Sequence, residues 1–488
     1  MPLAERDERL KHLHQLRESG VDPYPARAIE NRTKIHAVLD QFEAWQEQKM
    51  PLVLVGRIRR LRSHGKATFF DIEDGSAMIQ CYAKADALAE AYVLITTGGV
   101  ELGDFVVANG VPFTTKKGER TIELTGLALL SKAIRPLPEK WHGLSDIEER
   151  YRRRYLDFIA NPSTRAIQER RAQIIAMIRA FFVERGYLEV ETPILQAIAG
   201  GATARPFLTH HNSLDAELQL RIAPELYLKR LLVGGFERVF EIARCFRNEG
   251  IDRQHNPEFT QVESYEAYAD YHTYMGLVEE LFERLLGKIV GGMDMPFGHE
   301  TIHWTFPIPR LSYCDAVREH SGIDLLALDD DALMAVAKKK KLPLDATWSR
   351  AQIIDELFKA FVRPKLNAPV FIIDHPIELS PLTKRHPNNP KLVERFQLLV
   401  GGMELVNVFS ELNDPVDQRE RFSEQVAMRE AGDSEAQQLD EDFIQSLEYG
   451  MPPAAGLGLG IDRLVALLTN SHSLKEVIAF PTLRPQTS

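Results

Sequence analysis

Apolar residues recur at helical intervals near the start of the chain. Leu3, Leu10, Leu13 and Leu16 lie three or seven positions apart in a stretch that is otherwise rich in charge. Residues at these intervals share one face of an α-helix, so the pattern predicts an amphipathic helix with one apolar stripe. Residues 1–50 are therefore interpreted as an N-terminal helical extension.

Residues 51–135 have a different pattern, in which short apolar or alternating runs are broken by glycine. Alternation with a period of two predicts β-strands, because successive side chains of a strand point to opposite faces. Five strands are predicted, at residues 53–58, 67–72, 77–82, 104–110 and 120–130. Five short strands favour a small barrel of the oligonucleotide-binding (OB) type, although a small β-sandwich would give the same count.

The remaining residues are predicted to form a connector and one large α+β unit. Residues 136–160 contain two prolines and three consecutive arginines, which we interpret as a linker. From residue 161 the order Asn161-Pro162-Ser163 predicts a helix start, and Gly186 predicts the helix end. A strand is expected over residues 187–193, where the closing Pro193 suits an edge or an interface better than a sheet centre.

Composition narrows the class of protein. The chain is 44% hydrophobic and 26% charged, an ordinary globular mixture that excludes disorder as the main state. It lacks a run of the ~18 apolar residues that a membrane helix needs, and the first 22 residues carry charge where a signal peptide would be apolar. We therefore expect a soluble, cytoplasmic protein. Its three cysteines are far apart and never in CxxC spacing, which argues against a disulfide frame or a cysteine zinc site.

Charge is distributed unevenly along the chain. The net charge of −11 argues against a basic coat for nucleic acid. One short stretch of the predicted barrel nevertheless gathers five cations without an acid: Arg57, Arg59, Arg60, Arg62 and Lys66. Such a patch would suit phosphates, and a charged strand edge that prevents aggregation is the alternative. The run of lysines at 338–341 is interpreted as a solvated helix face.

Candidate chemistry first appears in residues 239–268, two alternating strands joined by a polar turn. Residues two apart share a strand face. The two rows that result are Glu241, Ala243, Cys245 and Arg247 on the first strand, and Phe259, Gln261, Glu263 and Tyr265 on the second. Burial of several ionised groups in a purely structural sheet is unfavourable, so the rows predict the floor of a ligand site.

Two further elements carry similar rows. Asn407, Phe409 and Glu411 again lie two apart, and Glu404 would face the other side of that strand unless a bulge intervenes at Leu405 or Val406. The third element alternates glycine at 456, 458 and 460 and then reaches Arg463. Glycine at every second position leaves one strand face without side chains, so a flat group can lie against the backbone. The spacing fits neither a Walker loop nor a Rossmann fingerprint.

These three stretches, taken together, resemble the three motifs of class II aminoacyl-tRNA synthetases. They are the helix and strand ending at Pro193, the segment Phe246-Arg247-Asn248-Glu249, and the glycine strand ending in Arg463. Within that class, residues 223–230 (APELYLKR) and 407–412 (NVFSEL) are similar to the lysyl-tRNA synthetases of class IIb. The resemblance runs from about residue 50 to the C-terminus.

The resemblance implies a fold, an assembly and a reaction. It implies an OB-type anticodon-binding barrel at 51–135, and a class II catalytic domain at 161–488 with an antiparallel β-sheet flanked by helices. It also implies a homodimer that contacts through the Pro193 region. The implied reaction joins L-lysine and ATP to lysyl-adenylate and pyrophosphate, and then transfers lysine to the 3′ end of tRNA(Lys).

The resemblance also implies an ATP site. Arg247 and Arg463 would be the catalytic residues, because a guanidinium between the lysine carboxylate and the α-phosphate offsets the repulsion of two anions. Phe259 would stack under adenine with Arg463 on the other side. The remaining implied contacts are Glu249 with the exocyclic amine, His255 with the distal phosphates, and Glu404 with Mg²⁺. Gln397 stands where the family often has a second acid, so the number of Mg²⁺ ions stays open.

The implied lysine site is rich in acids, as an ammonium requires. Glu225 would bind the α-amino group, and Glu263, Glu411 and the Tyr265 hydroxyl would bind the side-chain ammonium. The rest of the implied lysine site is Gly201, Asn407 and Phe409. An aspartate or asparagine enzyme would instead need a cation near residue 411.

The implied tRNA contacts lie on the barrel, where Phe69 and Gln80 would bind anticodon bases. Phe69 and Phe70 have opposite faces, so one of them should be core. At Gly126 the family more often has an acid. The N-terminal helix would dock on the body of the protein or on RNA.

Two functions of another class compete with this one. An RNA-binding paralogue without activity would have lost Arg247, Glu249 or Arg463, and all three are present. A ligase that lysylates proteins would resemble the catalytic unit alone, whereas this chain has a predicted barrel.

Overall fold

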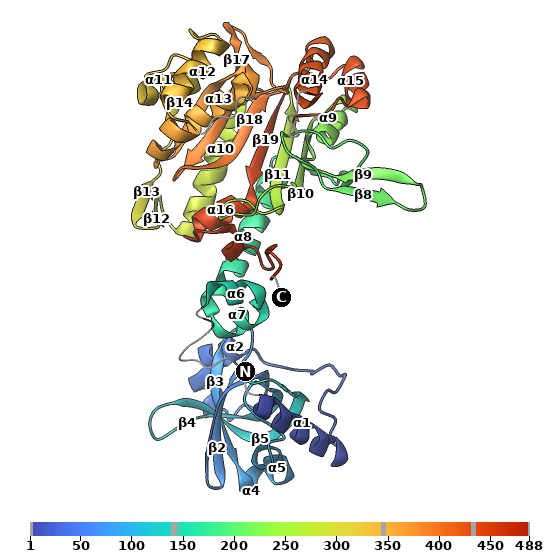
Figure 1. Ribbon diagram of the computed structural model, residues 1–488. Coiled ribbons are helices and arrows are strands. Elements are labelled where there is room, and N and C mark those ends of the chain that lie inside the picture. The colour runs from blue at the N-terminus through green and yellow to red at the C-terminus, as the bar shows by residue number, and fades with distance from the viewer. Residues whose placement is uncertain (1–2, 138–143, 145, 343–347, 431–435, 487–488) are drawn as a thin grey trace. The chain divides into compact units, whose positions relative to one another are not determined.

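The computed structural model describes residues 3–137, 144, 146–342, 348–430 and 436–486. It divides into two units, Met1–Ser145 and Asp146–Ser488 (Figure 1). Part of the predicted linker, residues 138–143 and 145, lies outside the described residues. The rest of that linker holds two short helices, α6 (Ile147–Arg152) and α7 (Arg154–Ala160), which the sequence interpretation did not contain.

The first unit is a closed five-stranded barrel of order β1-β2-β3-β5-β4. Its strands are β1 (Leu52–His64), β2 (Ala67–Glu73), β3 (Met78–Lys84), β4 (Phe105–Thr114) and β5 (Arg120–Ser131). All five predicted strands are therefore present, and closure excludes the sandwich alternative. Two short helices, α4 (Ala85–Leu88) and α5 (Glu90–Thr96), lie between β3 and β4.

Three helices precede the barrel: α1 (Leu3–Glu18), α2 (Ile35–Asp40) and α3 (Phe42–Glu47). Leu13 and Leu16 of α1 are buried, and Leu16 belongs to the barrel's hydrophobic core. The guanidinium of Arg9 donates to the carbonyls of Leu102 (2.9 Å) and Ala133 (3.1 Å). The apolar stripe of α1 therefore packs on the barrel of its own unit.

The second unit is built on a nine-stranded sheet of order β14-β15-β17-β18-β19-β11-β10-β6, with β16 paired to β17. Most neighbours in this sheet are antiparallel, and among its described strands only β14·β15 and β10·β6 are parallel. The strands are β6 (Leu188–Glu189), β10 (Arg238–Phe246), β11 (Glu258–Ala267), β14 (Arg310–Ser312), β15 (Val370–Pro376), β16 (Arg385–His386), β17 (Asn389–Val400), β18 (Met403–Ser410) and β19 (Ala454–Gly460).

The strand predicted over residues 187–193 is only Leu188–Glu189, so the predicted length was wrong. These two residues pair with Val239 and Phe240 at the sheet edge, which agrees with the expected edge position. Pro193 lies beyond the paired residues, and a proline cannot donate to a strand ladder.

Helices cover the sheet and create its core (Figure 1). The largest hydrophobic cluster joins the sheet to α8 (Pro162–Glu184), α10 (Tyr271–Leu285), α16 (Ile461–Leu468) and α17 (Leu474–Val477). As predicted, α8 begins after Asn161 with proline in its first turn. The other α-helices are α9 (Glu225–Val233), α11 (Tyr313–Ser321), α12 (Asp330–Lys339), α13 (Arg350–Leu357), α14 (Pro415–Glu430) and α15 (Glu441–Glu448).

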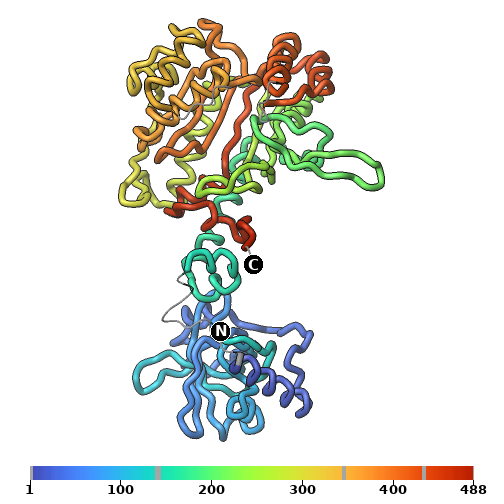
Figure 2. The backbone as a smooth tube through the Cα atoms, in the orientation of Figure 1, coloured from blue at the N-terminus to red at the C-terminus, as the bar shows by residue number. Residues whose placement is uncertain are grey.

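Shorter elements complete the second unit. π-Helices span Leu286–Val290 and Phe358–Val362, and 3₁₀-helices span Arg363–Lys365 and Ile377–Leu379. Two small sheets are formed by β12 (Asp294–Phe297) with β13 (Glu300–His303), and by β7 (Leu195–Gln196), β9 (Ala216–Leu220) and β8 (Leu208–His211). The β8–β9 hairpin projects from the body of this unit (Figure 2).

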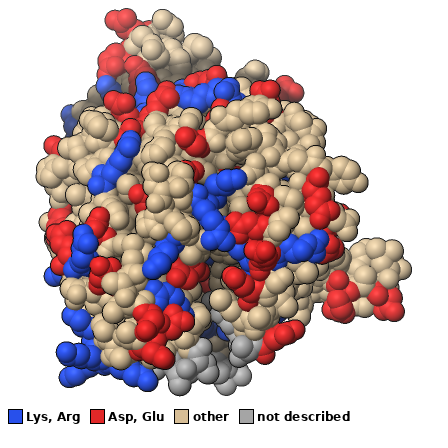
Figure 3. Space-filling view, turned by 90° about the horizontal axis from the view of Figure 1, so that it is seen from above, with Lys and Arg blue, Asp and Glu red and all other residues tan. Residues whose placement is uncertain are grey.

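Several predictions from composition agree with the structure. The three cysteines are free and buried. The side chains of Lys338 to Lys341 are exposed at the end of α12 and beyond it. Acidic and basic side chains are interspersed over the face shown in Figure 3, as expected for a chain without a basic coat. None of the helices in the described part of the chain is long and apolar enough to cross a membrane.

Candidate functional site

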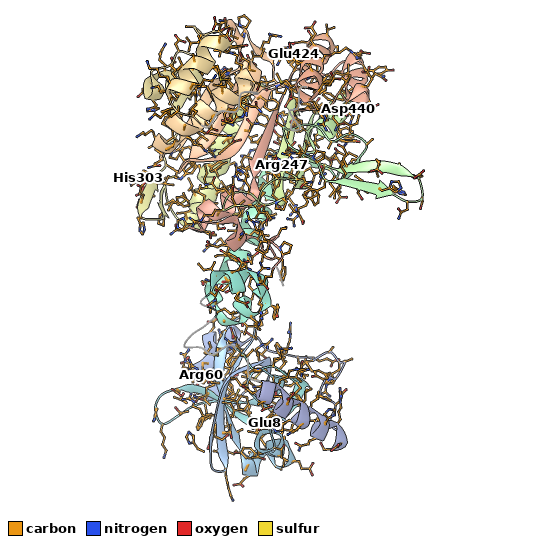
Figure 4. All side chains as sticks on the ribbon, viewed as in Figure 1. Glu8, Arg60, Arg247, His303, Glu424 and Asp440 are labelled. Carbon is orange, nitrogen blue, oxygen red and sulfur yellow. The ribbon has the colours of Figure 1, made fainter. Side chains whose placement is uncertain are left out.

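The two predicted rows of the hairpin lie side by side on one face. Strands β10 and β11 pair antiparallel, with Glu241 opposite Glu263, and Cys245 opposite Phe259. Arg247 follows β10, and its backbone N–H donates to the carbonyl of Pro257 (2.8 Å). This bond closes the loop between the strands and holds the base of the Arg247 side chain beside the sheet (Figure 4).

The glycine strand β19 joins this hairpin to the third row. Gly456 pairs with Tyr265 on one side and Phe409 on the other, and Gly458 pairs with Glu263 and Asn407. Each glycine therefore separates two functional side chains on neighbouring strands. At Gly456 an added Cβ would collide with Glu411 Oε1 and with the Tyr265 ring, so only glycine leaves these groups their present positions.

A bulge decides the face of Glu404. Val406 pairs with Leu398, but Glu404 pairs with Leu399, so Leu405 is the extra residue of a β-bulge. The bulge turns Glu404 to the face of Asn407, which the alternation of the sequence alone would have placed on the other side. Both residues line the same cavity.

This face forms the floor of a cavity of about 360 Å³. Twelve of the predicted ligand-binding residues line it: Gly201, Glu225, Arg247, Glu249, His255, Phe259, Glu263, Tyr265, Glu404, Asn407, Phe409 and Arg463. Glu411 and Gln397 are not among its lining residues. The structure thus brings together residues that are more than 250 positions apart in the chain.

One end of the cavity is cationic. The Arg247 guanidinium lies 5.0 Å from the centroid of the Phe259 ring. Its Nε is buried and has no hydrogen-bond partner within the described residues. Arg463 donates to the carbonyl of Glu404 (3.1 Å), and its Nη2 lies 3.3 Å from His255 Nε2. A half-buried guanidinium whose Nε donor is unused is suited to bind an anion.

The opposite end is acidic. Glu225, Glu263 and Glu411 are all buried. The Tyr265 hydroxyl donates to Glu263 (3.0 Å), and the Gln261 amide donates to the other oxygen of Glu263 (2.6 Å). Burial, together with repulsion from Glu225, raises the pKa of Glu263 to about 8. Burial also raises the pKa of Glu225 and of Glu411.

Two basic residues of this region were not predicted. Lys229 forms ion pairs with Glu225 (2.6 Å) and with Glu411. The spacing of Glu225 and Lys229, four residues apart on a helix, was the available signal. The Arg395 guanidinium donates to Asn407 Oδ1 (2.7 Å) and to the Leu379 carbonyl (2.9 Å). Arg395 lies two residues before Gln397 on the same strand and so shares its face.

The candidate metal region holds one half-buried carboxylate, Glu404. Gln397 Oε1 lies 3.1 Å from Nε2 of His375. Burial and the charge of Arg395 lower the pKa of His375 to about 3, so this imidazole is neutral. No group of three or more potential metal ligands (His, Cys, Asp or Glu) occurs among the described residues.

The two predicted barrel residues lie on one outer face. Phe69 pairs with Tyr82, and their rings stack with centroids 4.5 Å apart. Phe70 is in the core, which settles which of the two phenylalanines faces outward. Gln80 lies two residues before Tyr82 and donates to Glu119 (2.9 Å). Phe69 and Tyr82 thus form an aromatic platform beside a polar side chain.

Most of the predicted basic patch is engaged within the barrel. Arg57 donates to the carbonyl of Gly103 (3.1 Å), Arg59 pairs with Glu73 (2.8 Å), and Arg60 pairs with Asp71 (3.3 Å). Arg62 and Lys66 are exposed. Gly126 pairs with Asn109, whose amide would meet an added Cβ at 3.1 Å.

Known proteins resemble the chain over nearly its whole length. Residues 146–484 match the family of class II tRNA synthetases (D, K and N), and residues 52–130 match the OB-fold nucleic acid binding domain. Lysine–tRNA ligases of Dehalococcoides mccartyi and Moorella thermoacetica are each 48% identical to it, over 98% of this chain and 97% of their own length. The lysine–tRNA ligase of Roseiflexus castenholzii is 48% identical over 99% of both chains.

Proposed function

This chain belongs to the class II tRNA synthetases (D, K and N), and we propose that it is a lysine–tRNA ligase. The reaction has two steps. Lysine and ATP form lysyl-adenylate and pyrophosphate, and the lysyl group then passes to the 3′ end of tRNA(Lys). We assign the catalytic role to residues 161–488, and the anticodon-binding role to residues 51–135.

The charges of the cavity are the main support for lysine as the substrate. At its acidic end Glu225 and Glu263 line the cavity, and Glu411, which is not a lining residue, is joined to Glu225 through the ammonium of Lys229. When all three acids are ionised, their negative charge exceeds the charge of Lys229 by two. Free lysine brings two ammonium groups, one on the α-carbon and one on the side chain, and so matches that excess. An aspartate side chain would instead add an anion to an acidic pocket. An asparagine side chain is neutral and would leave the negative charge of the pocket uncompensated.

The cationic end supports the chemistry of adenylate formation. The lysine carboxylate forms a bond to the α-phosphorus of ATP, and the bond from that phosphorus to the pyrophosphate oxygen breaks. Both reactants are anions, so a guanidinium between them stabilises the transition state, where the charges approach most closely. Arg247 is suited to this role because its buried Nε has a free donor next to the cavity.

The residues of the other predicted ATP contacts line the same cavity as Arg247. Phe259 offers a ring face for adenine, and Glu249 offers an acceptor for its amine. Arg463 and His255, whose polar atoms lie 3.3 Å apart, would contact the phosphates. The Arg247 guanidinium now lies over Phe259, so we expect it to move aside when adenine stacks there.

Magnesium is the cofactor we propose. Glu404 would hold it, because a carboxylate on the cavity wall together with phosphate oxygens and water gives the oxygen ligands that Mg²⁺ prefers. The ion would neutralise charge on the phosphates. The Gln397 amide, which contacts His375, adds no negative charge to this region.

The barrel would bind the anticodon of tRNA(Lys). The stacked rings of Phe69 and Tyr82 offer a surface for an unpaired base, and Gln80 offers hydrogen bonds beside it. We expect this charging to occur in the cytoplasm.

We also propose a homodimer that contacts through the region of Pro193. Three apolar side chains near it are exposed: Leu188 (49%), Ile194 (43%) and Leu195 (49%). Grouped exposed apolar residues are typical of protein interfaces, and a second copy would cover them. Sedimentation of the purified protein as a monomer would contradict this assembly.

Lysine-dependent pyrophosphate exchange, measured with each of the twenty amino acids, tests the proposed function. Radiolabelled pyrophosphate should enter ATP only when lysine is present, because only lysine matches both ends of the cavity. Exchange with aspartate or asparagine in place of lysine would refute the substrate. Lack of exchange with every amino acid would refute the activity.

A further inference from the structure

Lys229 is a fully buried ammonium that reaches acids from two distant parts of the chain. Its Nζ lies 2.6 Å from Glu225 Oε1, one helical turn earlier on α9, and it also pairs with Glu411, which follows β18. None of its side chain is exposed, and it is not among the residues that line the cavity. Lys229 therefore can act on a ligand only through the two acids that it contacts.

The three groups depend on one another for their charge. Burial alone would lower the pKa of Lys229, but the charges of Glu225 and Glu411 raise it above its ordinary value. Burial raises the pKa of both acids, and Lys229 opposes that rise. Removal of the ammonium would leave two buried carboxylates without a counter-ion, and they would take up protons.

We propose that Lys229 is a positioning residue for amino-acid selection, which fixes the orientation of Glu225 and Glu411 and keeps both carboxylates ionised. This inference rests on the proposed function, in which those acids bind the two ammonium groups of lysine. Lys229 leaves Glu411 Oε1 directed toward Gly456 and Tyr265, where a cationic group of the ligand can meet it. Without Lys229, both the direction and the charge of that oxygen would change.

Other charged groups face the same cluster and must be considered with it. From the elements packed around it these are Glu241 and Arg221, which pair with each other (2.6 Å), Glu263 and Tyr265 on β11, and Arg395 on β17. Arg221 balances Glu241, and Arg395 is hydrogen-bonded to Asn407 (2.7 Å). Lys229 is thus the cation in direct contact with Glu225 and Glu411.

The proposal predicts an effect on pH dependence that a merely structural role would not produce. Lysine binding requires ionised acids, so the KM for lysine falls as pH rises and the acids lose their protons. In the Lys229→Met variant the acids hold their protons to higher pH, because the nearby positive charge is gone. The fall of KM should therefore move to higher pH.

The test is pyrophosphate exchange by the full-length protein between about pH 6.5 and 9. For Lys229→Met we expect a KM for lysine roughly 10- to 100-fold higher at neutral pH, a change of ~1.4 to 2.8 kcal/mol. The KM for ATP should change less than about twofold, which lies within ~0.5 kcal/mol. Lys229→Arg, which keeps the charge, should return the pH dependence to that of the parent protein.

Lys132→Met in the barrel is a matched control. Lys132 is also fully buried and pairs with two acids, Glu101 and Asp104 (2.5 and 2.9 Å). Its loss should lower stability without change in the KM for lysine. If Lys229→Met does not fold, Lys229→Gln carries the same expectation, because its amide keeps a donor but no charge.

The outcomes separate the two hypotheses. A parental KM for lysine with parental pH dependence in the neutral variants would overturn the role of Lys229, even if kcat fell. Lack of lysine-dependent exchange in the parent protein would instead overturn the proposed function.

Discussion

Gly456→Ala should weaken lysine binding, because the glycine leaves space that two binding groups already occupy. A Cβ at this position would collide with Glu411 Oε1 and with the ring of Tyr265. Neither neighbour can yield easily, since Glu411 pairs with Lys229 and the Tyr265 hydroxyl bonds to Glu263 (3.0 Å). Overpacking of this kind costs about 1–3 kcal/mol.

The free-energy cost of the collision sets the expected change in the KM for lysine. If it falls on the bound state, the KM for lysine rises by roughly 5- to 150-fold, at ~1.4 kcal/mol for each factor of ten. The KM for ATP should stay near that of the parent, because the cationic end of the cavity is formed by other residues. Pyrophosphate exchange at varied lysine and varied ATP measures both constants.

Gly458→Ala is the comparison variant. The nearest atom to a Cβ at Gly458 is the Asn407 carbonyl oxygen, at 4.0 Å, so a methyl group fits there without displacing a neighbour. We expect a much smaller rise in the KM for lysine, with thermal unfolding as a control for folding. A parental KM for lysine in Gly456→Ala would contradict the predicted collision with Glu411 and Tyr265.

Three further changes test other parts of the account. Phe69→Ala removes a surface on which a base can stack, an interaction worth about 1–3 kcal/mol per base, so the KM for tRNA in aminoacylation should rise roughly 5- to 150-fold. Pyrophosphate exchange should not change. An unaltered KM for tRNA would contradict the anticodon-binding role of the barrel. The pKa of Glu263 is raised to about 8, so this acid is neutral below that pH and ionised above it. Lysine should therefore bind more tightly as pH rises through about 8. In calorimetric titrations of Glu263→Gln, the lysine affinity should depend less on pH. An unchanged pH dependence in this variant would contradict the role of Glu263. Gln397→Glu adds a carboxylate near the proposed metal region and should lower the Mg²⁺ concentration that half-saturates exchange, an effect whose absence would argue against a metal there.

Alternation along strands predicted much of the site. Residues two apart share a face, so the rows on β10, β11 and β18 could be assigned before any pairing was known. The face of Glu404 could not, because it depends on the bulge at Leu405, and a bulge is a local irregularity that alternation does not contain. The outward face of Phe69 likewise depends on strand register.

Contacts between segments that lie far apart in the sequence could not be predicted from it. Lys229 and Glu225 have helical spacing, but the second partner, Glu411, comes from a strand end far along the chain, and only tertiary structure brings it to α9. The hydrogen bond from Arg395 to Asn407 also joins separate strands and therefore could not be predicted from the sequence. The strand prediction at 187–193 was too long because alternation continued past the last bond to the sheet, in which the Val190 N–H donates to the Phe240 carbonyl (2.9 Å).

Arg247→Ala removes the guanidinium that we propose stabilises the transition state of adenylate formation. Lysine-dependent pyrophosphate exchange should fall by at least roughly 10²- to 10³-fold, the effect of removing one group that stabilises transition-state charge. Circular dichroism and thermal unfolding should show a folded protein, since the guanidinium has an unused donor rather than a structural partner at Nε. A folded Arg247→Ala protein that exchanges pyrophosphate near the parental rate would contradict the catalytic role of Arg247.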